Sequence, residues 1–329
     1  MTNQNTQTPV AHEPRTRRLE PGTIFANYGM LGVLVVLLAV AVVLYPRFLS
    51  PGNVSDILVQ NTAVGIVAVG MTFVIISGGF DLSVGAIYAL GATVAAGVTV
   101  QSGSVPLGIA SALAVGLLCG GLNGLLVSRL RINPFVATLG SSSIFAGIAY
   151  IYSNSSPFIV RDPAFKILAK ASVAGIPLPI VILIATFILG AVALAYTHYG
   201  RHVYSVGGNP QASWLSGIRV KGITGSVYVL TGVIAAFAGT LDASRLSVGQ
   251  ADIGANVALD AIAIVIVGGT SLMGGEGAIW RTGVGLLIFA TLTNLFYSLN
   301  VSQHWQLIAK GAIVLGAVAL DAHFRKRRE

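Results

Sequence analysis

The chain is dominated by apolar runs that are each about as long as a lipid bilayer is thick. A membrane-spanning helix needs about 20 mostly apolar residues, because hydrocarbon offers its backbone polar groups no water and they must pair within the segment. The sequence therefore predicts an all-α polytopic membrane protein with about ten spanning helices. Their expected ranges are 28–45, 57–76, 82–100, 105–128, 134–153, 176–197, 223–241, 257–273, 282–299 and 305–320, the eighth and tenth being short.

The composition excludes two other classes of protein. Hydrophobic residues make up 54% of the chain and charged residues 9%, whereas an ordinary soluble domain carries about 25% charged residues. The apolar runs are continuous and do not alternate with polar residues, which excludes a membrane β-barrel.

The charged residues mostly lie between the apolar runs. Most of the 19 lysines and arginines fall in the N-terminal segment, in alternate loops and at the C-terminus. Because cytoplasmic loops carry an excess of such residues, both termini are expected in the cytoplasm. We expect a basic tail over residues 1–27, one transmembrane domain over 28–321 and a second basic tail over 322–329. The scatter of the charges among loops argues against a nucleic-acid partner.

Residues that usually bind metals or nucleotides are few and scattered. Cys119 is the single cysteine and lies in an apolar run, which excludes a disulfide framework. His198 and His202 are four residues apart but lack a nearby Glu or Cys to complete a zinc site. The nearest match to a phosphate-binding loop has Lys221 before Gly222, which is the wrong order. We expect no metal, no cofactor bound by this chain and no enzymatic activity of its own.

One apolar run is broken by glycines and followed by a carboxylate. Gly78 and Gly79 interrupt the run, and Asp81 precedes the next one. A carboxylate at membrane depth costs roughly 2.5–3.5 kcal/mol, so Asp81 is expected to have a role. A helix restarting at Leu82 would place Asp81 at its N-cap. We predict a discontinuous helix, with a structural role for Asp81 favoured over contact with a substrate.

Polar side chains inside the predicted spans are candidates for a transport path. A neutral, hydroxyl-rich solute needs amide and hydroxyl partners more than fixed charges, although the same side chains also join helices by hydrogen bonds. Asp260 and Lys310 are expected at similar depth and are predicted to form an ion pair. The candidates for the path or the helix break are Gly78, Gly79, Asp81, Ser83, Asn133, Thr138, Asp260, Thr270 and Asn294.

Two loops are long enough to have structure of their own. The outer one, residues 154–175, could face an extracytoplasmic partner. In the inner one, residues 198–222, Asn209 suits the N-cap of a helix, Pro210 its first position and Gly217 the position after its end. The sequence predicts one short helix there, over residues 210–216.

Trp214 and Leu215 on this short helix have two interpretations. Aromatic anchors in pockets dominate the energy of protein interfaces, so both residues suit docking into a partner. Tryptophan is also common in the lipid headgroup belt. The residues alone leave both interpretations open.

Five sequence blocks occur in the order of a known family. They are AVGMTFVIISGGFDLSVGA from Ala68, NPFVATLG from Asn133, GRHVYSVGGNPQASWLSGI from Gly200, LDAIAIVIVGGTSLMGGEG from Leu259 and QLIAKGAIVL from Gln306. From about residue 25 to residue 321, the chain resembles the ribose-type monosaccharide permeases, which are the membrane subunits of sugar-importing ABC transporters.

The resemblance implies an importer subunit of the bacterial cytoplasmic (inner) membrane for a monosaccharide or related polyol. It implies a second permease subunit, identical or similar, an extracytoplasmic sugar-binding protein and separate ABC ATPase subunits that use ATP. The chain departs from the family pattern at Ala258, where an acidic residue is common, and at Glu276, where a basic one is. The residues implied to couple to the ATPase are Gly208, Asn209, Pro210, Gln211, Trp214, Leu215, Gly217 and Arg219.

Two alternative functions stay open at this point. A branched-chain amino-acid-type ABC permease would share the architecture and the need for partner subunits. An ion-coupled secondary transporter would use Asp81 and Asp260 as relay groups and would transport without partners. A membrane-embedded enzyme is disfavoured, since we find no credible nucleophile or metal cluster in the sequence.

Overall fold

The computed structural model describes residues 21–325 and is almost wholly helical. A helix occupies each of the ten predicted stretches, which confirms the all-α polytopic membrane architecture. Within the described residues, seven helices are long and apolar enough to cross a membrane, namely α2, α3, α4 with its extension, α5, α7, α10 and α12. The ten helices are α1 (Pro21–Leu44), α2 (Pro51–Ile76), α3 (Val84–Ser102), α4 (Val105–Gly124), α5 (Pro134–Ser153), α7 (Leu178–Tyr196), α10 (Val220–Leu246), α11 (Val257–Val267), α12 (Ile279–Ser298) and α13 (Gln303–Arg325).

The eighth predicted span is wrong in length. Helix α11 ends at Val267 and not at residue 273, because a glycine pair follows and Gly269 takes a left-handed φ of 90°. With 11 residues, it is about 16 Å long, roughly half the hydrocarbon thickness of a bilayer. Helix α11 therefore reaches only part of the way across.

Both terminal helices extend beyond their predicted spans. Helix α1 begins at Pro21, within the predicted N-terminal tail, and α13 continues to Arg325, within the predicted C-terminal tail. Residues 1–20 and 326–329, the rest of the two predicted tails, lie outside the described residues.

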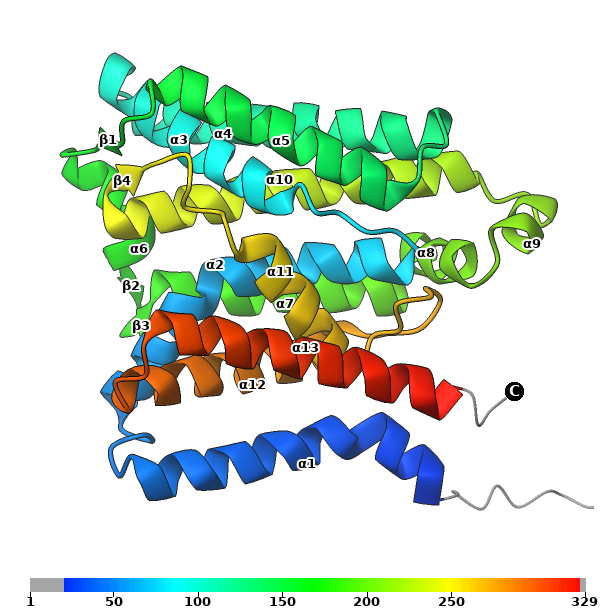
Figure 1. The fold of residues 1–329 in the computed structure, drawn as a ribbon. Helices are drawn as coiled ribbons and strands as arrows, with labels where there is room; N and C mark the ends of the chain where they lie inside the picture. The colour runs from blue at the N-terminus through cyan, green and yellow to red at the C-terminus, as the bar shows by residue number, and fades with distance from the viewer. Residues whose placement is uncertain (1–20, 326–329) are drawn as a thin grey trace, which may run out of the picture.

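The two ends of the described chain lie on the same side of the molecule. Figure 1 shows the start of α1 and the end of α13 at the end that also carries the short helices α8 (His198–Gly208) and α9 (Pro210–Leu215). All the short strands lie at the opposite end. By the excess of basic residues, the end with α8 and α9 is the cytoplasmic one.

Polar caps and prolines fix where several helices begin. Ser50, Ser104 and Asn133 each accept a hydrogen bond from a backbone N–H of the following first turn, and each helix has a proline at its first or second position. These caps accept hydrogen bonds from backbone N–H groups that have no carbonyl partner in a preceding turn of the helix. Proline, which has no N–H, costs no hydrogen bond at these first positions.

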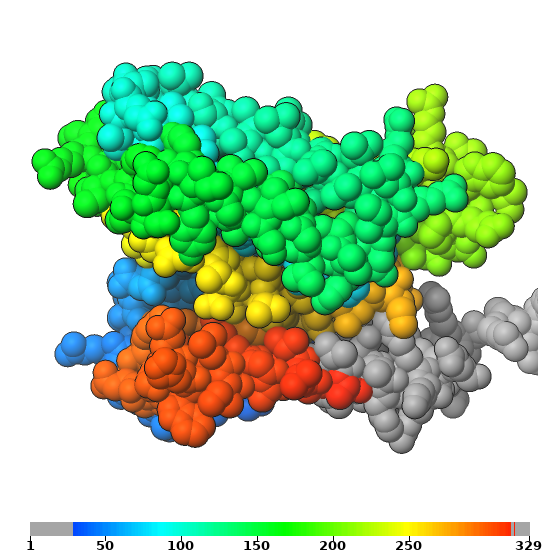
Figure 2. Space-filling view, turned by 45° about the horizontal axis from the view of Figure 1, so that its top comes forward, coloured from blue at the N-terminus to red at the C-terminus, as the bar shows by residue number. Residues whose placement is uncertain are grey.

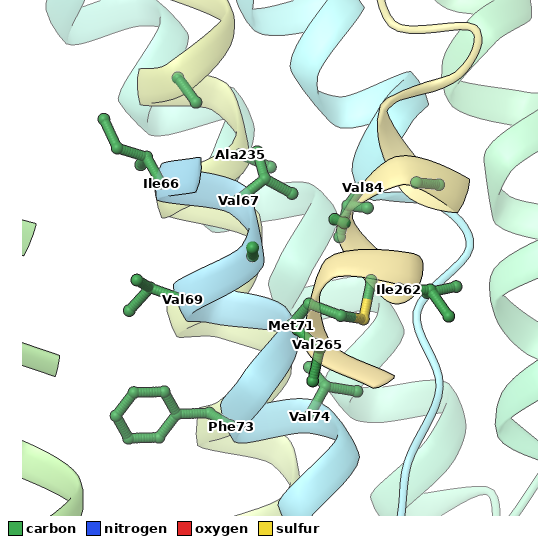
Figure 3. Packing of buried hydrophobic residues seen from close by; sticks show 14 of the residues in the cluster. Ile66, Val67, Val69, Met71, Phe73, Val74, Val84, Ala235, Ile262 and Val265 are labelled. Atoms are coloured by element: carbon green, nitrogen blue, oxygen red, sulfur yellow. The ribbon is translucent and has the colours of Figure 1, made fainter. Parts of the chain in front are cut away.

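The core lies around α2 and α10. Helix α10 packs against α2, α3 and α4, and α2 also contacts α7, α11 and α12. Figure 3 shows Val67, Met71 and Val74 of α2 packed with Ala235 of α10 and Val265 of α11. The two central helices thus present apolar side chains to neighbours and not to lipid.

Helices α4 and α10 approach each other along a stripe of glycines. A Cβ added at Gly116 would lie 2.6 Å from the carbonyl oxygen of Gly232, and one at Gly124 would lie 2.7 Å from that of Gly225. Small residues at such spacing let membrane helices pack at backbone contact.

The outer loop is structured, as its length predicted. Strand β1 (Phe158–Ile159) pairs antiparallel with β4 (Val248–Gly249), and β2 (Ser172–Val173) pairs with β3 (Ile176–Pro177). Along the chain, a 3₁₀ turn, η2 (Pro163–Lys166), and the one-turn helix α6 (Ile167–Lys170) lie between β1 and β2. This short-strand region covers the outer end of α10.

One face of the molecule is hollowed along its length. Figure 2 shows α3, α4 and α5 on one side, α12 and α13 on the other, and the segment containing α11 set between them as a floor. We call this hollow the α11 groove. Its floor is the segment that contains the half-length helix α11.

Candidate functional site

The helix break predicted between the second and third spans is present. Helix α2 ends at Ile76 with Ser77 as its C-cap, and the chain is not helical again until Val84. Gly78 takes a left-handed φ of 80°, which an L-residue rarely adopts. We call residues 77–83 the Asp81 linker.

The predicted restart of the helix at Leu82, with Asp81 as its N-cap, is wrong. Helix α3 begins two residues later, with Ser83 as its N-cap. Asp81 Oδ1 accepts hydrogen bonds from Ser83 N at 2.9 Å and from Ser83 Oγ at 2.6 Å. Asp81 therefore fixes the residue before the helix and does not cap the first turn itself, because Leu82 and Ser83 form a turn before the helix begins.

The two polar side chains at the end of the Asp81 linker are buried, although Gly78 of the linker is exposed. Asp81 and Ser83 have no exposed surface, and Asn123 of α4 donates from Nδ2 to Ser83 Oγ at 2.6 Å. In the described part of the chain, Asp81 Oδ2 and Asn123 Oδ1 have no hydrogen-bond partner. Two acceptor atoms of one buried network thus remain available to a proton, a water or a ligand.

The backbone of the linker is also held by neighbouring helices. Leu82 N donates to Thr138 Oγ1 of α5 at 3.1 Å, and Tyr228 Oη of α10 donates to the carbonyl oxygen of Phe80 at 3.1 Å. Thr138 was a predicted site residue. Asn123, an amide within an apolar run, is also one of the polar side chains inside the predicted spans, whereas Tyr228 was not predicted.

The other predicted path residues are spread over the molecule. Asn133 is exposed and serves as the N-cap of α5. Asn294 exchanges two amide hydrogen bonds with Asn53, at 3.0 and 3.3 Å, and so joins α12 to the start of α2. Thr270 is buried, and its hydroxyl lacks a partner among the described residues. Among the described residues, none of these three forms a hydrogen bond with the Asp81 linker.

Asp260 and Lys310 lie together, as the sequence suggested. Lys310 Nζ is 3.2 Å from Asp260 Oδ1 and 3.1 Å from Oδ2, joining α13 to α11. The side chain of Lys310 is 21% exposed and that of Asp260 is 27% exposed, so the pair is partly shielded from solvent or lipid. The pair tethers the half-length helix to its neighbour.

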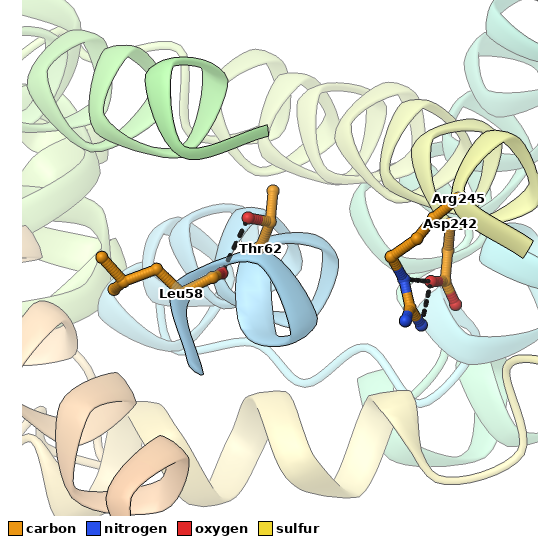
Figure 4. A network of polar contacts seen from close by, with 4 residues as sticks. All are labelled: Leu58, Thr62, Asp242 and Arg245. Carbon is orange, nitrogen blue, oxygen red and sulfur yellow. Dashed lines mark hydrogen bonds and ion pairs between the residues drawn. The ribbon is translucent and has the colours of Figure 1, made fainter. Parts of the chain in front are cut away.

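A second ion pair, which sequence reasoning missed, lies near the outer end of α10. Arg245 Nη2 is 2.7 Å from Asp242 Oδ1, three residues earlier on the same helix. Figure 4 shows this pair facing the part of α2 that carries Thr62. Thr62, Asp242 and Arg245 line one small pocket between the two helices. The spacing of three residues was a signal that could have identified the pair.

The inner loop, residues 198–222, contains the predicted short helix. Asn209 Oδ1 accepts a hydrogen bond from Ala212 N at 2.9 Å, and Gly217 follows the helix with a left-handed φ of 82°. Trp214 is 67% exposed and Leu215 is 73% exposed. The helix thus presents two large apolar side chains outward at the cytoplasmic end of the molecule.

The base of the inner loop meets two other segments at backbone contact. The N–H of Gly275 donates to the carbonyl oxygen of Ile76 at 2.8 Å. A Cβ added at Gly274 would lie 2.9 Å from Gly207 O and from Gly78 Cα. We call Gly78, Gly207, Gly274 and Gly275 the glycine junction. It joins the end of α2, the end of α8 and the loop that follows α11.

A tyrosine of α8 reinforces this junction. Tyr204 Oη donates to the carbonyl oxygen of Gly277 at 2.7 Å. Burial raises the pKa of Tyr204, so the hydroxyl keeps its proton for this hydrogen bond. Sequence reasoning missed the junction, although glycine pairs at 78–79, 207–208 and 274–275 were visible.

Within residues 21–325, no group of three or more His, Cys, Asp or Glu side chains is arranged to hold a metal ion. Cys119 is a buried free cysteine of α4.

Comparison with known proteins gives one family. The chain matches the family model described as "Branched-chain amino acid transport system / permease component" over residues 53–318. It is 39% identical over 307 residues to the ribose import permease protein RbsC of Bacillus subtilis, covering 93% of this chain and 95% of that protein.

Two further relatives agree. The ribose import permease protein RbsC of Escherichia coli K12 is 39% identical over 292 residues, 88% of this chain and 91% of the relative. The L-arabinose ABC transporter permease protein AraH of Azospirillum brasilense is 36% identical over 300 residues, 91% of this chain and 88% of the relative. No solved structure matches the chain.

The family match spans the chain from near the start of α2 into α13 and so includes the Asp81 linker, the inner loop and the ion pair of α11 with α13. The relatives extend that similarity over nearly the full length. The chain belongs to this permease family, in its ribose-type branch.

Proposed function

We propose that this chain is the membrane permease subunit of an ABC importer that carries a monosaccharide or related polyol across the bacterial inner membrane. The relatives named above are ribose and arabinose permeases, which supports a sugar over a branched-chain amino acid. The polar side chains at the ends of helices and in the Asp81 linker suit a neutral solute rich in hydroxyl groups.

The observation that carries the proposal is the outward display of Trp214 and Leu215. A six-residue helix is marginal alone in water, so its caps and the contacts at its base must hold it. Two exposed apolar anchors on a helix held in this way form a docking site for a protein partner. The partner that we propose is the ABC ATPase subunit.

The glycine junction suggests how docking reaches the membrane interior. Movement of α8 would press on the end of α2 and on the loop after α11, because Gly207 touches both at backbone contact. The Asp81 linker starts directly after α2, and the loop begins where α11 ends. Movement driven by the ATPase would thus reach the Asp81 linker and the half-length helix α11.

The α11 groove is our candidate for half of the transport path. It is open along one face of the molecule, so a second permease subunit is needed to close it. The ion pair of Asp260 with Lys310 would hold α11 in place while the path changes its access. A periplasmic sugar-binding protein would deliver substrate at the outer end, near the short strands.

The substrate class is tested on the cognate binding protein. That protein is purified and titrated by calorimetry with pentoses, hexoses, polyols and branched-chain amino acids. Binding of a monosaccharide or polyol supports the proposal. Binding of an amino acid alone would contradict the sugar assignment while leaving an ABC importer in place.

A further inference from the structure

A cavity of about 900 Å³ opens at the cytoplasmic end of the molecule. Its walls come from the end of α2, the segment after α4, the inner loop and the start of α10. Helices α4 and α10 are both long and apolar enough to cross a membrane, so we expect the cavity to lie where their cytoplasmic ends meet the lipid headgroups.

The charge of this cavity is strongly positive. Arg131, Arg219 and Lys221 line it, and its lining contains no Asp or Glu. Within residues 21–325, the ion pairs are Asp242 with Arg245 and Asp260 with Lys310, and no carboxylate pairs with the three cavity cations. Three cations from two separate segments thus share one space without a counter-charge from the described chain.

Hydrogen-bond donors and an aromatic ring complete the lining. Ser128 and Thr224 contribute hydroxyl groups and Trp214 an indole. Arginine and hydroxyl donors are the groups that bind phosphate oxygens.

The backbone next to Arg131 is unusual in two ways. Residues Leu125–Arg129 form a π-helix at the end of α4, and π-helical turns are rare and frequent at functional sites. Arg131 itself has a left-handed φ of 56°, which is uncommon for a residue other than glycine. The hydrogen bond from Ile132 N to Leu126 O, 3.1 Å long, holds this turn. Strained backbone of this kind is found at ligand clamps.

We propose that this cavity binds the phosphate group of an anionic phospholipid of the inner leaflet. Basic pockets between membrane helices on the cytoplasmic side are suited to anionic headgroups. Because the inner loop forms one wall, a bound headgroup would brace the surface that carries Trp214. The occupancy of the site would therefore depend on the lipid composition of the membrane.

The test measures the binding of short-chain lipids to the purified full-length permease in detergent. Dioctanoyl phosphatidylglycerol is compared with dioctanoyl phosphatidylcholine and with inorganic phosphate, at low ionic strength, by native mass spectrometry. The variants are Arg131→Gln and Lys221→Gln. The matched control is Arg201→Gln, which removes an exposed arginine of α8 that does not line the cavity. Thermal unfolding in phosphatidylcholine checks that each variant is folded.

We expect phosphatidylglycerol to bind more tightly than phosphatidylcholine. Each cavity variant should weaken that binding about fivefold, and the Arg201→Gln control should leave it unchanged. Inorganic phosphate that binds as tightly as the lipid, with the same sensitivity to both variants, would overturn the phospholipid assignment, because the ligand of the site would then be a soluble anion.

Two further outcomes would overturn the proposal. One is equal affinity for phosphatidylglycerol in the wild type, in both cavity variants and in the control. The other is that Arg131→Gln and Lys221→Gln leave lipid binding unchanged but weaken association with the ATPase subunit. The cavity would then be a site for carboxylates of the partner protein.

Discussion

At the scale of single residues, the partly shielded pair of Asp260 and Lys310 offers a direct test of the contact between α11 and α13. Lys310→Met leaves Asp260 without its partner and should lower the free energy of unfolding by about 1–3 kcal/mol, between the values for exposed and buried pairs. The measurement is thermal unfolding of the purified permease, with Lys170→Met, a change at an exposed lysine, as control.

The double variant Asp260→Asn with Lys310→Met separates pairing from independent effects. If the two residues act as a pair, the double variant should recover part of the lost stability. A double variant that loses as much as the two single variants together would show that the residues do not interact.

Ser83 is the residue that connects Asp81 to Asn123. Ser83→Ala removes the hydroxyl that donates to Asp81 and accepts from Asn123, and it should lower the free energy of unfolding by about 1–3 kcal/mol because buried polar atoms lose their partner. Ser143→Ala on the exposed side of α5 is the control. Equal stability of the two variants would contradict the role of this network.

At the scale of elements, the glycine junction contains its own matched pair of positions. A Cβ added at Gly207 would overlap the carbonyl oxygen of Ile76, whereas one added at the neighbouring Gly208 would come no closer than 4.0 Å to Gly275 Cα. We therefore expect Gly207→Ala to lower the thermal stability of the permease and Gly208→Ala to preserve it, as measured by thermal unfolding of the purified variants. Equal unfolding temperatures for the two variants would argue against backbone contact at the junction.

The short helix α9 is the second element with a clear prediction. Trp214→Ala should weaken binding of the ATPase subunit about thirtyfold, the effect of losing an interface anchor worth about 2 kcal/mol. Trp305→Ala, at a tryptophan of similar exposure near the start of α13, should leave that binding unchanged. Pull-down of the ATPase subunit by each variant measures the difference.

Sequence patterns predicted the elements better than their contacts. The apolar runs gave the ten helices, and Asn209, Pro210 and Gly217 gave the short inner helix, because these signals are local. The end of α11 was missed because the residues after Val267 are still mostly small or apolar. The glycine junction could not be predicted, since it depends on backbone contacts between segments more than 60 residues apart.

At the scale of the whole molecule, the helices form a scaffold around two interrupted elements. The Asp81 linker and the half-length α11 lie inside that scaffold, and the glycine junction connects both to the inner loop. In the proposed function, this arrangement would let a permease without nucleotide-binding motifs of its own respond to a partner that binds at its cytoplasmic surface.

The most direct test of this account is sugar uptake into proteoliposomes that contain the permease with and without its partners. The account predicts uptake of the binding protein's sugar only when the ATPase subunit, the binding protein and ATP are all present, and no effect of an ionophore. Uptake by this chain alone that an ionophore abolishes would contradict the account and show an ion-coupled secondary transporter.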